Sequence, residues 1–191
     1  MIDPALARRI ALVAFDVDGT LTDNGVYIGA GTGGATGERL ELKRFDIQDG
    51  LGIVMLRRAG IVVAFISARH SEATTLRAAE LGVTLVRQGK GLRKVPELQA
   101  IATAHGIPLG DIAFMGDDLA DIAVMQQVGL GVAPRNAVAE VSAVATLQLT
   151  REGGRGAVRE FAELLLRARG EWDRLVADYV ADSARVEAEV A

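Results

Sequence analysis

The chain contains no cysteine, and only 4% of its 191 residues are aromatic. Without a thiol, disulfides, thiolate zinc sites and cysteine nucleophiles are all excluded. The hydrophobic runs, such as Ile61–Ile66, are far too short to cross a bilayer, so no membrane partner is expected. A net charge of -4 argues against a general nucleic-acid binder, which normally carries a basic face. Met1–Arg9 lacks the pattern of a signal peptide, and we therefore expect a cytoplasmic protein.

Short aliphatic runs are abundant, and each is followed by a polar turn and a helix-like segment. Six runs predict strands, at Ile10–Phe15, Ile61–Ile66, Val83–Val86, Ile112–Met115, Leu130–Ala133 and Ala145–Leu149. Five segments predict helices, at Gly50–Ala59, Ser71–Leu81, Lys94–Ala104, Asp118–Val128 and Arg155–Arg169. This alternation predicts an α/β fold, a three-layer, doubly wound parallel sheet with helices on both faces. We expect residues 1–170 to form one domain.

Two segments depart from the alternation. Residues 26–45 have alternating flanks around a glycine-rich centre, which predicts a β-hairpin flap with a flexible tip. The spacing from Thr22 to Asp49 leaves room for this hairpin and none for a cap domain. Residues 171–191 are charged and rich in Ala and Val, so we expect a helical tail, exposed or packed on a partner, with Trp172 as its anchor.

The strongest chemical signal is a pair of acids directly after the first predicted strand. Asp16 and Asp18 stand two residues apart in Phe-Asp-Val-Asp-Gly-Thr, and Gly19 allows the backbone to turn there. An Asp-x-Asp-Gly sequence also begins calcium loops. The EF-hand pattern needs a Glu twelve positions along and further ligands, which this segment does not supply. A catalytic carboxylate pair is therefore the preferred interpretation.

A second acidic group follows the strand predicted at Ile112–Met115. Asp117, Asp118 and Asp121 are more acids than a helix start needs for capping. In an open α/β sheet, ligands bind beyond the carboxyl ends of the strands, where both acidic groups fall. Hard oxygen ligands supplied one or two per segment suit Mg²⁺.

Four ordered motifs resemble those of the haloacid dehalogenase superfamily: the Asp16–Asp18 pair, Ser67 after a strand, Lys94 at a helix start, and Gly116-Asp117-Asp118 with Asp121. The resemblance implies a phosphatase in which Asp16 is the nucleophile and Asp18 the general acid and base. It also implies Mg²⁺ held by the carboxylates of Asp16 and Asp117 and by the backbone carbonyl of Asp18. Ser67 and Lys94 would bind the phosphoryl group.

From about Leu12 to Trp172, the chain is most similar to the 3-deoxy-D-manno-octulosonate 8-phosphate phosphatase family. The resemblance implies a homotetramer, a small sugar-acid phosphate as substrate, and a sugar-binding loop at Asp46, Ile47, Gln48, Asp49 and Gly50. Asp46 and Gln48 depart from the family pattern. Three guanidinium groups suit the anionic substrate, those of Arg69, Arg77 and Arg155.

Three alternatives stay open at the level of sequence. One is a phosphatase for a nonulosonate 9-phosphate, and another is phosphoryl transfer to an acceptor other than water. The third is a non-catalytic module of this fold that serves in oligomerisation. The presence of Asp16, Asp18 and Asp117 together argues against the third.

Overall fold

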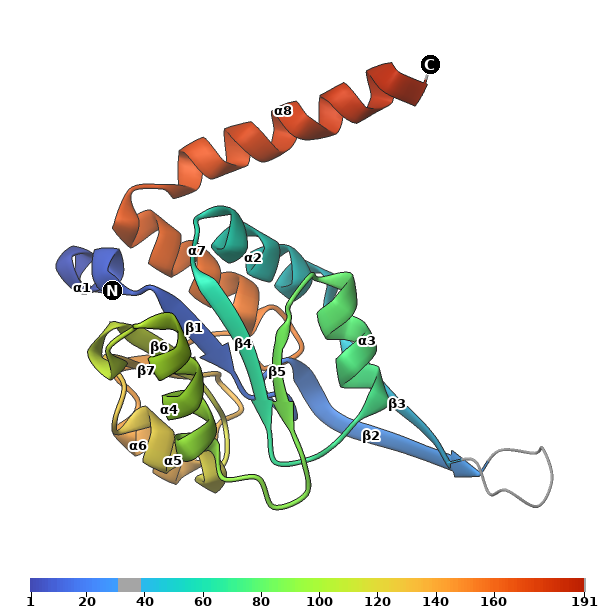
Figure 1. Ribbon diagram of the computed structural model, residues 1–191, viewed down its shortest axis with the longest axis vertical. Helices are drawn as coiled ribbons and strands as arrows, with labels where there is room; N and C mark the ends of the chain where they lie inside the picture. Colours follow the sequence, from blue (N-terminus) through green and yellow to red (C-terminus); the bar gives the residue numbers. More distant parts are fainter. Residues whose placement is uncertain (31–38, 191) are drawn as a thin grey trace.

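The computed structural model describes residues 1–30 and 39–190 (Figure 1). Six strands form one sheet in which all described pairings are parallel, in the order β5-β4-β1-β6-β7-β8. The strands are β1 (Leu12–Phe15), β4 (Val62–Ser67), β5 (Leu85–Gln88), β6 (Ile112–Met115), β7 (Leu130–Ala133) and β8 (Leu147–Gln148). The predicted parallel sheet is therefore confirmed.

Alternate side chains of the sheet enter two separate hydrophobic cores. In β1, Val13 and Phe15 belong to one core, whereas Leu12 and Ala14 belong to the other. Successive side chains of a strand point to opposite faces, so a strand buried on both faces reads as an uninterrupted aliphatic run. This explains why the strands are visible in the sequence as such runs.

Helices cover both faces of the sheet and complete the three layers (Figure 1). The core that contains Phe15 receives apolar residues from four helices: α1 (Pro4–Arg9), α2 (Ile47–Arg58), α3 (Glu72–Glu80) and α7 (Ala157–Arg169). The opposite core receives α4 (Lys94–His105), α5 (Leu119–Met125) and α6 (Ala139–Val144).

Several element boundaries differ from the prediction. Helix α2 begins at Ile47 rather than Gly50, because the Asp46 carboxylate accepts the Gln48 N–H at 2.7 Å and caps the helix earlier. Helix α1, helix α6 and a short 3-10 turn at Leu109–Asp111 were not predicted. Signals for α1 were nevertheless present, since Asp3 caps it and Pro4 occupies its first position.

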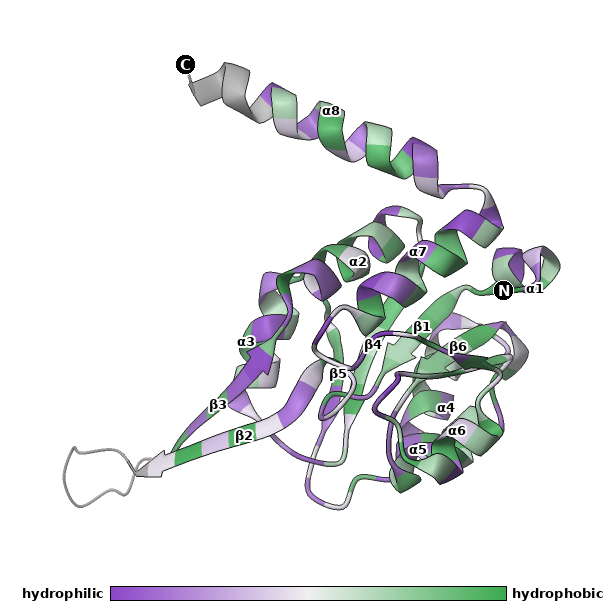
Figure 2. Ribbon diagram, turned by 180° about the vertical axis from the view of Figure 1, so that it is seen from behind, coloured by the Kyte–Doolittle hydropathy of each residue, from purple (hydrophilic) through white to green (hydrophobic). Residues whose placement is uncertain are grey.

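The predicted hairpin is present as β2 (Thr22–Ala30) and β3 (Arg39–Phe45). Gly31, Gly33, Gly34 and Gly37 of its expected tip lie outside the described residues. The hairpin exposes apolar residues and buries a charged one, the reverse of the usual distribution. Its paired residues Tyr27 and Leu42 are 66% and 54% exposed, whereas the side chain of Lys43 is fully buried. Figure 2 shows hydrophobic bands on the projecting part of β2.

The predicted helical tail is α8 (Trp172–Val190), which leaves the body of the molecule after its first turns (Figure 1). Trp172 is buried and anchors the helix, with the guanidinium carbons of Arg159 and Arg167 at 5.1 and 5.4 Å from its ring centre. Hydrophobic residues recur along one side of the helix in Figure 2. Of the helices in residues 1–30 and 39–190, none is long and apolar enough to span a membrane.

The chain order reverses at β1, which lies between β4 and β6 in the sheet. After β1 the chain builds β4 and β5 on one side, and then β6 to β8 on the other. A crevice forms at the carboxyl ends of strands where the order reverses in this way. The two acidic groups follow β1 and β6, so the fold brings them to the same crevice.

Candidate active site

Three acids and one lysine meet beyond the carboxyl ends of β1 and β6. Carboxylate oxygens of Asp16, Asp117 and Asp121 all lie within 4.8 Å of one another. Lys94, the first residue of α4, donates to Asp16 Oδ1 and Asp121 Oδ1, each at 2.5 Å. All four residues are buried. Sequence segments around positions 16, 94 and 117 therefore form a single polar centre.

The charges in this centre do not balance, and the pKa values reflect it. Burial, together with repulsion from Asp121, raises the pKa of Asp16 to about 7, although Lys94 opposes the shift. Burial and the charges of Asp16 and Asp121 raise the pKa of Asp117 to about 8. Burial disfavours the charged form of Lys94, but Asp16 and Asp121 outweigh it and raise the lysine pKa. Three carboxylates thus share one fixed cation.

This donor set fits a divalent ion. Lys94 satisfies Asp121 and one oxygen of Asp16, and Thr20 donates to Asp117 Oδ1 at 3.1 Å. Asp16 and Asp117 keep carboxylate oxygens for a metal, and a hard divalent cation prefers such ligands. An added cation would also relieve the repulsion that raises both pKa values. The expected ligand pair is therefore brought together.

Asp121 has a role that the sequence interpretation did not assign. Besides binding Lys94, it accepts the backbone N–H groups of Asp117 and Asp118 at 3.1 and 3.2 Å. It therefore fixes the Asp117 turn and the lysine at once. Its position three residues after the helix cap Asp118 is that of a capping box, and this spacing was visible in the sequence.

Asp18 lies beside this centre but binds a different cation. Its Oδ1 is 2.6 Å from Lys43 Nζ, which β3 of the hairpin supplies. Ser67, the last residue of β4, is buried and accepts the Arg69 N–H through its Oγ at 3.1 Å. Ser67 ends β4 and Asp18 follows β1, so the predicted acid and the predicted phosphate ligand both lie at the carboxyl edge of the sheet.

Comparison with known proteins identifies the family. Residues 85–160 match the haloacid dehalogenase-like hydrolases. The 3-deoxy-D-manno-octulosonate 8-phosphate phosphatase of Escherichia coli is 38% identical over 169 residues, which cover 88% of this chain and 86% of that protein. The chain belongs to this phosphatase family. It is a phosphoric monoester hydrolase of the haloacid dehalogenase type, without a cap domain in the described residues.

Solved structures of the phosphatase family have the same fold. The 3-deoxy-D-manno-octulosonate 8-phosphate phosphatase of Moraxella catarrhalis, solved with magnesium, phosphate and KDO, is 36% identical with a TM-score of 0.82, over 92% of this chain and 97% of that chain. The cobalt-bound enzyme of Haemophilus influenzae is 33% identical with a TM-score of 0.77, over 86% and 92%.

The residues predicted to bind the sugar are less closely grouped than the acids. Asp46 to Gly50 form the cap and the start of α2, where Ile47 is 78% exposed and Asp49 is buried. The Asp49 carboxylate accepts the N–H groups of Gly156 and Arg159 at the start of α7. Burial raises the pKa of Asp49 to about 6 despite these bonds. In this member of the family, Asp49 joins two helices.

The three predicted arginines each have a partner within the chain. Arg69 Nη2 pairs with Glu41 Oε2 of the hairpin at 2.5 Å. Arg77 donates to the Asp46 carbonyl at 3.1 Å and pairs with Glu80 at 2.8 Å, so it bridges α3 and the start of α2. Arg155 is 3.3 Å from Asp23 and its side chain is 55% exposed. Of the three, Arg155 is the most open to a ligand.

Close packing explains why positions 153 and 154 are glycine. A Cβ at Gly153 would strike the Gly19 carbonyl, and one at Gly154 would strike the backbone of Thr22. Asn136 binds the same loops, donating to Gly19 O at 2.9 Å and accepting from Gly153 N at 2.6 Å. The glycine loop therefore packs on the loop that carries Asp18, a support that the sequence interpretation missed.

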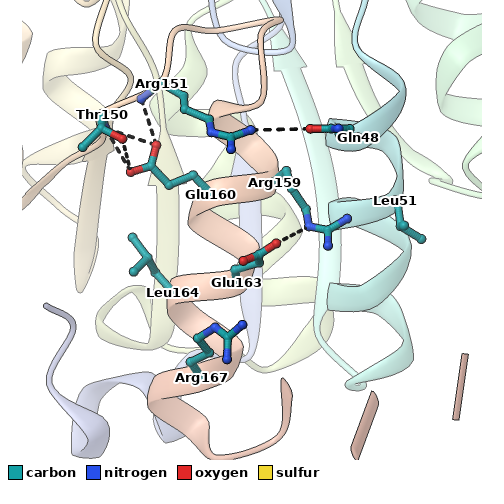
Figure 3. A pocket seen from close by; sticks show the side chains of 9 residues that line it. All are labelled: Gln48, Leu51, Thr150, Arg151, Arg159, Glu160, Glu163, Leu164 and Arg167. Carbon is teal, nitrogen blue, oxygen red and sulfur yellow. Dashed lines mark hydrogen bonds and ion pairs between the residues drawn. The ribbon is translucent and has the colours of Figure 1, made fainter. Parts of the chain in front are cut away.

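A groove of about 650 Å³ runs between α2 and α7 (Figure 3). Gln48 faces Arg151 across it at 3.4 Å. Its acids are already engaged, because Glu160 accepts the N–H groups of Thr150 and Arg151, and Glu163 pairs with Arg159 at 2.7 Å. None of the acids at positions 16, 117 and 121 lines the groove, so the groove is separate from the acidic cluster.

Proposed function

We propose that the chain hydrolyses 3-deoxy-D-manno-octulosonate 8-phosphate to 3-deoxy-D-manno-octulosonate and phosphate, with Mg²⁺ as cofactor. The observation that carries the proposal is the buried centre in which Lys94 bridges Asp16 and Asp121 beside Asp117. The identity of 38% to the Escherichia coli phosphatase supports the substrate. A non-catalytic module would have no reason to maintain four buried charged groups in one place.

The geometry suits a covalent mechanism. A carboxylate oxygen of Asp16 attacks the phosphorus, a P–O bond to Asp16 forms, and the bond to the sugar oxygen breaks. Asp18 gives its proton to the departing sugar oxygen. Water then attacks the phosphorus of the aspartyl-phosphate and gives a proton to Asp18. Cleavage of the P–O bond to Asp16 releases phosphate and restores both acids.

The remaining groups of the centre hold charge and position. Asp16 and Asp117 would hold Mg²⁺, together with the carbonyl of Asp18. When bound, Mg²⁺ supplies positive charge that offsets the charge of the phosphoryl oxygens. Lys94 adds a second cation, and Ser67 offers its hydroxyl to a phosphoryl oxygen at the end of β4. Asp121 keeps Lys94 in place through the contact at 2.5 Å.

The sugar acid requires recognition of a carboxylate in addition to the phosphate. We assign this recognition to Arg69 and Arg155, with contributions from Arg77 and the segment from Asp46 to Gly50. Guanidinium groups bind carboxylates bidentately, and Arg155 is exposed enough to do so. We further propose that residues 1–170 form the phosphatase domain, that residues 171–191 form a helical tail, and that the enzyme is cytoplasmic.

A panel of sugar phosphates tests the substrate. Purified enzyme with Mg²⁺ is expected to release phosphate from the octulosonate 8-phosphate with a higher kcat/KM than from any nonulosonate 9-phosphate. Phosphate release and sugar-phosphate loss are measured together, and equal rates show that water is the acceptor. Turnover of the nine-carbon compounds alone would reject the proposed substrate. Substrate loss without phosphate release would instead indicate transfer to another acceptor.

We also propose that the enzyme is a homotetramer in which the hairpin contacts another copy. Leu40 and Leu42 are 55% and 54% exposed in β3, and Tyr27 is 66% exposed in β2. Gathered apolar residues of this kind favour a protein interface over water. Helix α8, which projects from the body, offers a second surface (Figure 1).

A charge placed on the hairpin is expected to dissociate the assembly. Leu42→Glu should lower the mass measured by light scattering, because a buried carboxylate without a partner opposes association. Leu76→Glu is the control, since Leu76 is similarly exposed, at 68%, but lies on α3. A wild-type mass of 20.1 kDa would contradict the tetramer. An unchanged mass for Leu42→Glu would remove the hairpin from the interface.

A further inference from the structure

Lys43 is a buried cation that the proposed mechanism leaves without a task. Its side chain is fully buried, although lysine is almost never buried without a paired acid. Its Nζ lies 2.6 Å from Asp18 Oδ1 and 4.0 Å from Glu41 Oε1. Within residues 1–30 and 39–190, the ammonium group has no aligned hydrogen bond, so ion pairing alone offsets its loss of water.

The hairpin places Lys43 there by strand alternation. Glu41 and Lys43 lie on the side of β3 that faces the crevice, whereas Leu40 and Leu42 are exposed on the other side. The Glu41 carboxylate in turn pairs with Arg69 at 2.5 Å, which ties β3 to the segment after β4. A chain of alternating charges thus runs from Arg69 through Glu41 and Lys43 to Asp18.

The contact distinguishes the two oxygens of Asp18. Oδ1 is buried against Lys43, while the whole side chain keeps 22% of its surface exposed. The exposed surface therefore belongs to the other atoms of the side chain, and Oδ2 is the oxygen that the contact with Lys43 does not hold. A general acid is effective only when the oxygen that carries the proton points at the leaving group. Fixing one oxygen leaves the other to face the crevice.

We infer that Lys43 is a positioning residue, supplied by the hairpin, which holds Asp18 Oδ1 so that Oδ2 exchanges the proton with the leaving group and with water. The inference rests on the proposed function, because it requires Asp18 to be the acid of a phosphatase. It gives the hairpin a part in the chemistry of its own subunit. Lys43 makes no bond to the phosphorus and moves no proton itself.

Two substrates with different leaving groups distinguish a positioning role of Lys43 from a purely structural one. An alkyl phosphate needs a proton on its departing oxygen, whereas 4-nitrophenyl phosphate releases 4-nitrophenolate, which is stable without a proton. In single-turnover rapid-quench experiments, Lys43→Met is expected to slow cleavage of the octulosonate 8-phosphate by about 10²-fold, the size of effect that misplacement by 1 Å produces. Cleavage of 4-nitrophenyl phosphate should slow by less than about threefold, since little general-acid catalysis is at stake. Equal losses for the two compounds would overturn the inference.

A double-mutant cycle tests whether Lys43 acts through Asp18. With the octulosonate 8-phosphate, Asp18→Asn combined with Lys43→Met should be no slower than Asp18→Asn alone, because coupled residues are not additive. Additive losses, or a raised KM with unchanged kcat, would assign Lys43 to another role. Lys90→Met, at an exposed lysine before α4, should retain wild-type rates.

Two further measurements keep the result interpretable. If Lys43→Met does not fold, Lys43→Gln keeps a neutral donor of similar reach and is expected to show the same selective loss for the alkyl phosphate. Lys43→Arg should recover part of the rate, and no recovery relative to Lys43→Gln would count against a role for the charge. An inactive wild-type enzyme would reject the proposed function instead, so the two failures are distinguishable.

Discussion

Replacement of Asp16 by asparagine is expected to lower kcat by roughly 10⁴ to 10⁶-fold, the range seen when one member of a catalytic triad is removed. The amide is nearly isosteric but cannot form the aspartyl-phosphate. Asp16 is also the acid that Lys94 holds at 2.5 Å, and its carboxylate lies in the cluster with Asp117. The measurement is phosphate release from the octulosonate 8-phosphate at saturating substrate and Mg²⁺.

The fold of the Asp16→Asn variant should remain intact. Burial and Asp121 raise the pKa of Asp16, so the folded state carries this charge at a cost that the amide removes. Lys94 keeps Asp121 as a partner. We therefore expect a melting temperature no lower than that of the wild type in EDTA, and an unchanged mass in solution. Activity close to wild type would reject the covalent mechanism.

Removal of Mg²⁺ is expected to be the other large effect. Activity in EDTA should fall by at least about 10³-fold, because a catalytic metal contributes several kcal/mol of charge stabilisation, at about 1.4 kcal/mol per tenfold. Mg²⁺ at a hundred times its Kd should stabilise the fold by about 2.7 kcal/mol, or roughly 5–10 °C in Tm for a chain of this length. Activity that persists after complete chelation would contradict the metal site.

The metal-free protein should also lose stability as the pH rises. The pKa values of Asp16 and Asp117 are raised from 3.8 to about 7 and about 8 in the folded state. Between pH 4 and 8 the folded protein therefore holds protons that the unfolded chain has released, so stability present below pH 4 is lost as the pH approaches 8. Melting curves in EDTA across this range measure the loss, and Mg²⁺ should reverse it at pH 8.

Neighbouring acids supply the matched control for the metal. Asp117→Asn is expected to abolish both the activity and the stabilisation by Mg²⁺. Asp118→Asn should retain both, because Asp118 caps α5 through the Leu119 N–H at 2.7 Å and asparagine caps helices equally well. A loss of Mg²⁺ stabilisation in Asp118→Asn equal to that in Asp117→Asn would contradict the assignment of the ligands.

Much of the candidate site was predictable because its residues follow strand ends or begin a helix. Asp16 comes immediately after β1, Asp117 follows β6 after one glycine, and Lys94 begins α4. A parallel sheet brings such positions to one edge whatever the details of packing. The buried strands were equally visible as aliphatic runs, since both faces of each are covered.

Contacts between distant loops were not predictable in the same way. The Asn136 bridge, the Asp49 cap on α7 and the packing of Gly153 on Gly19 join segments about 100 residues apart or more, or depend on side-chain rotamers. The Lys43–Asp18 pair joins residues closer in sequence, but it was not predictable either. A hairpin pattern predicts which residues alternate, but not which face turns toward the crevice, because no local interaction sets the angle between hairpin and sheet.

The amino-acid sequence alone determined the class of fold, the family, and which acids and which lysine are candidates for the site. These properties depend on local patterns and on the position of residues relative to strand ends. Only the tertiary structure decided that Asp121 clamps Lys94, that Arg77 is occupied between α3 and α2, and that the charged side of the hairpin is the buried one. Such choices arise from the packing of separate elements, where the partners of a side chain are set by distance in space and not by distance along the chain.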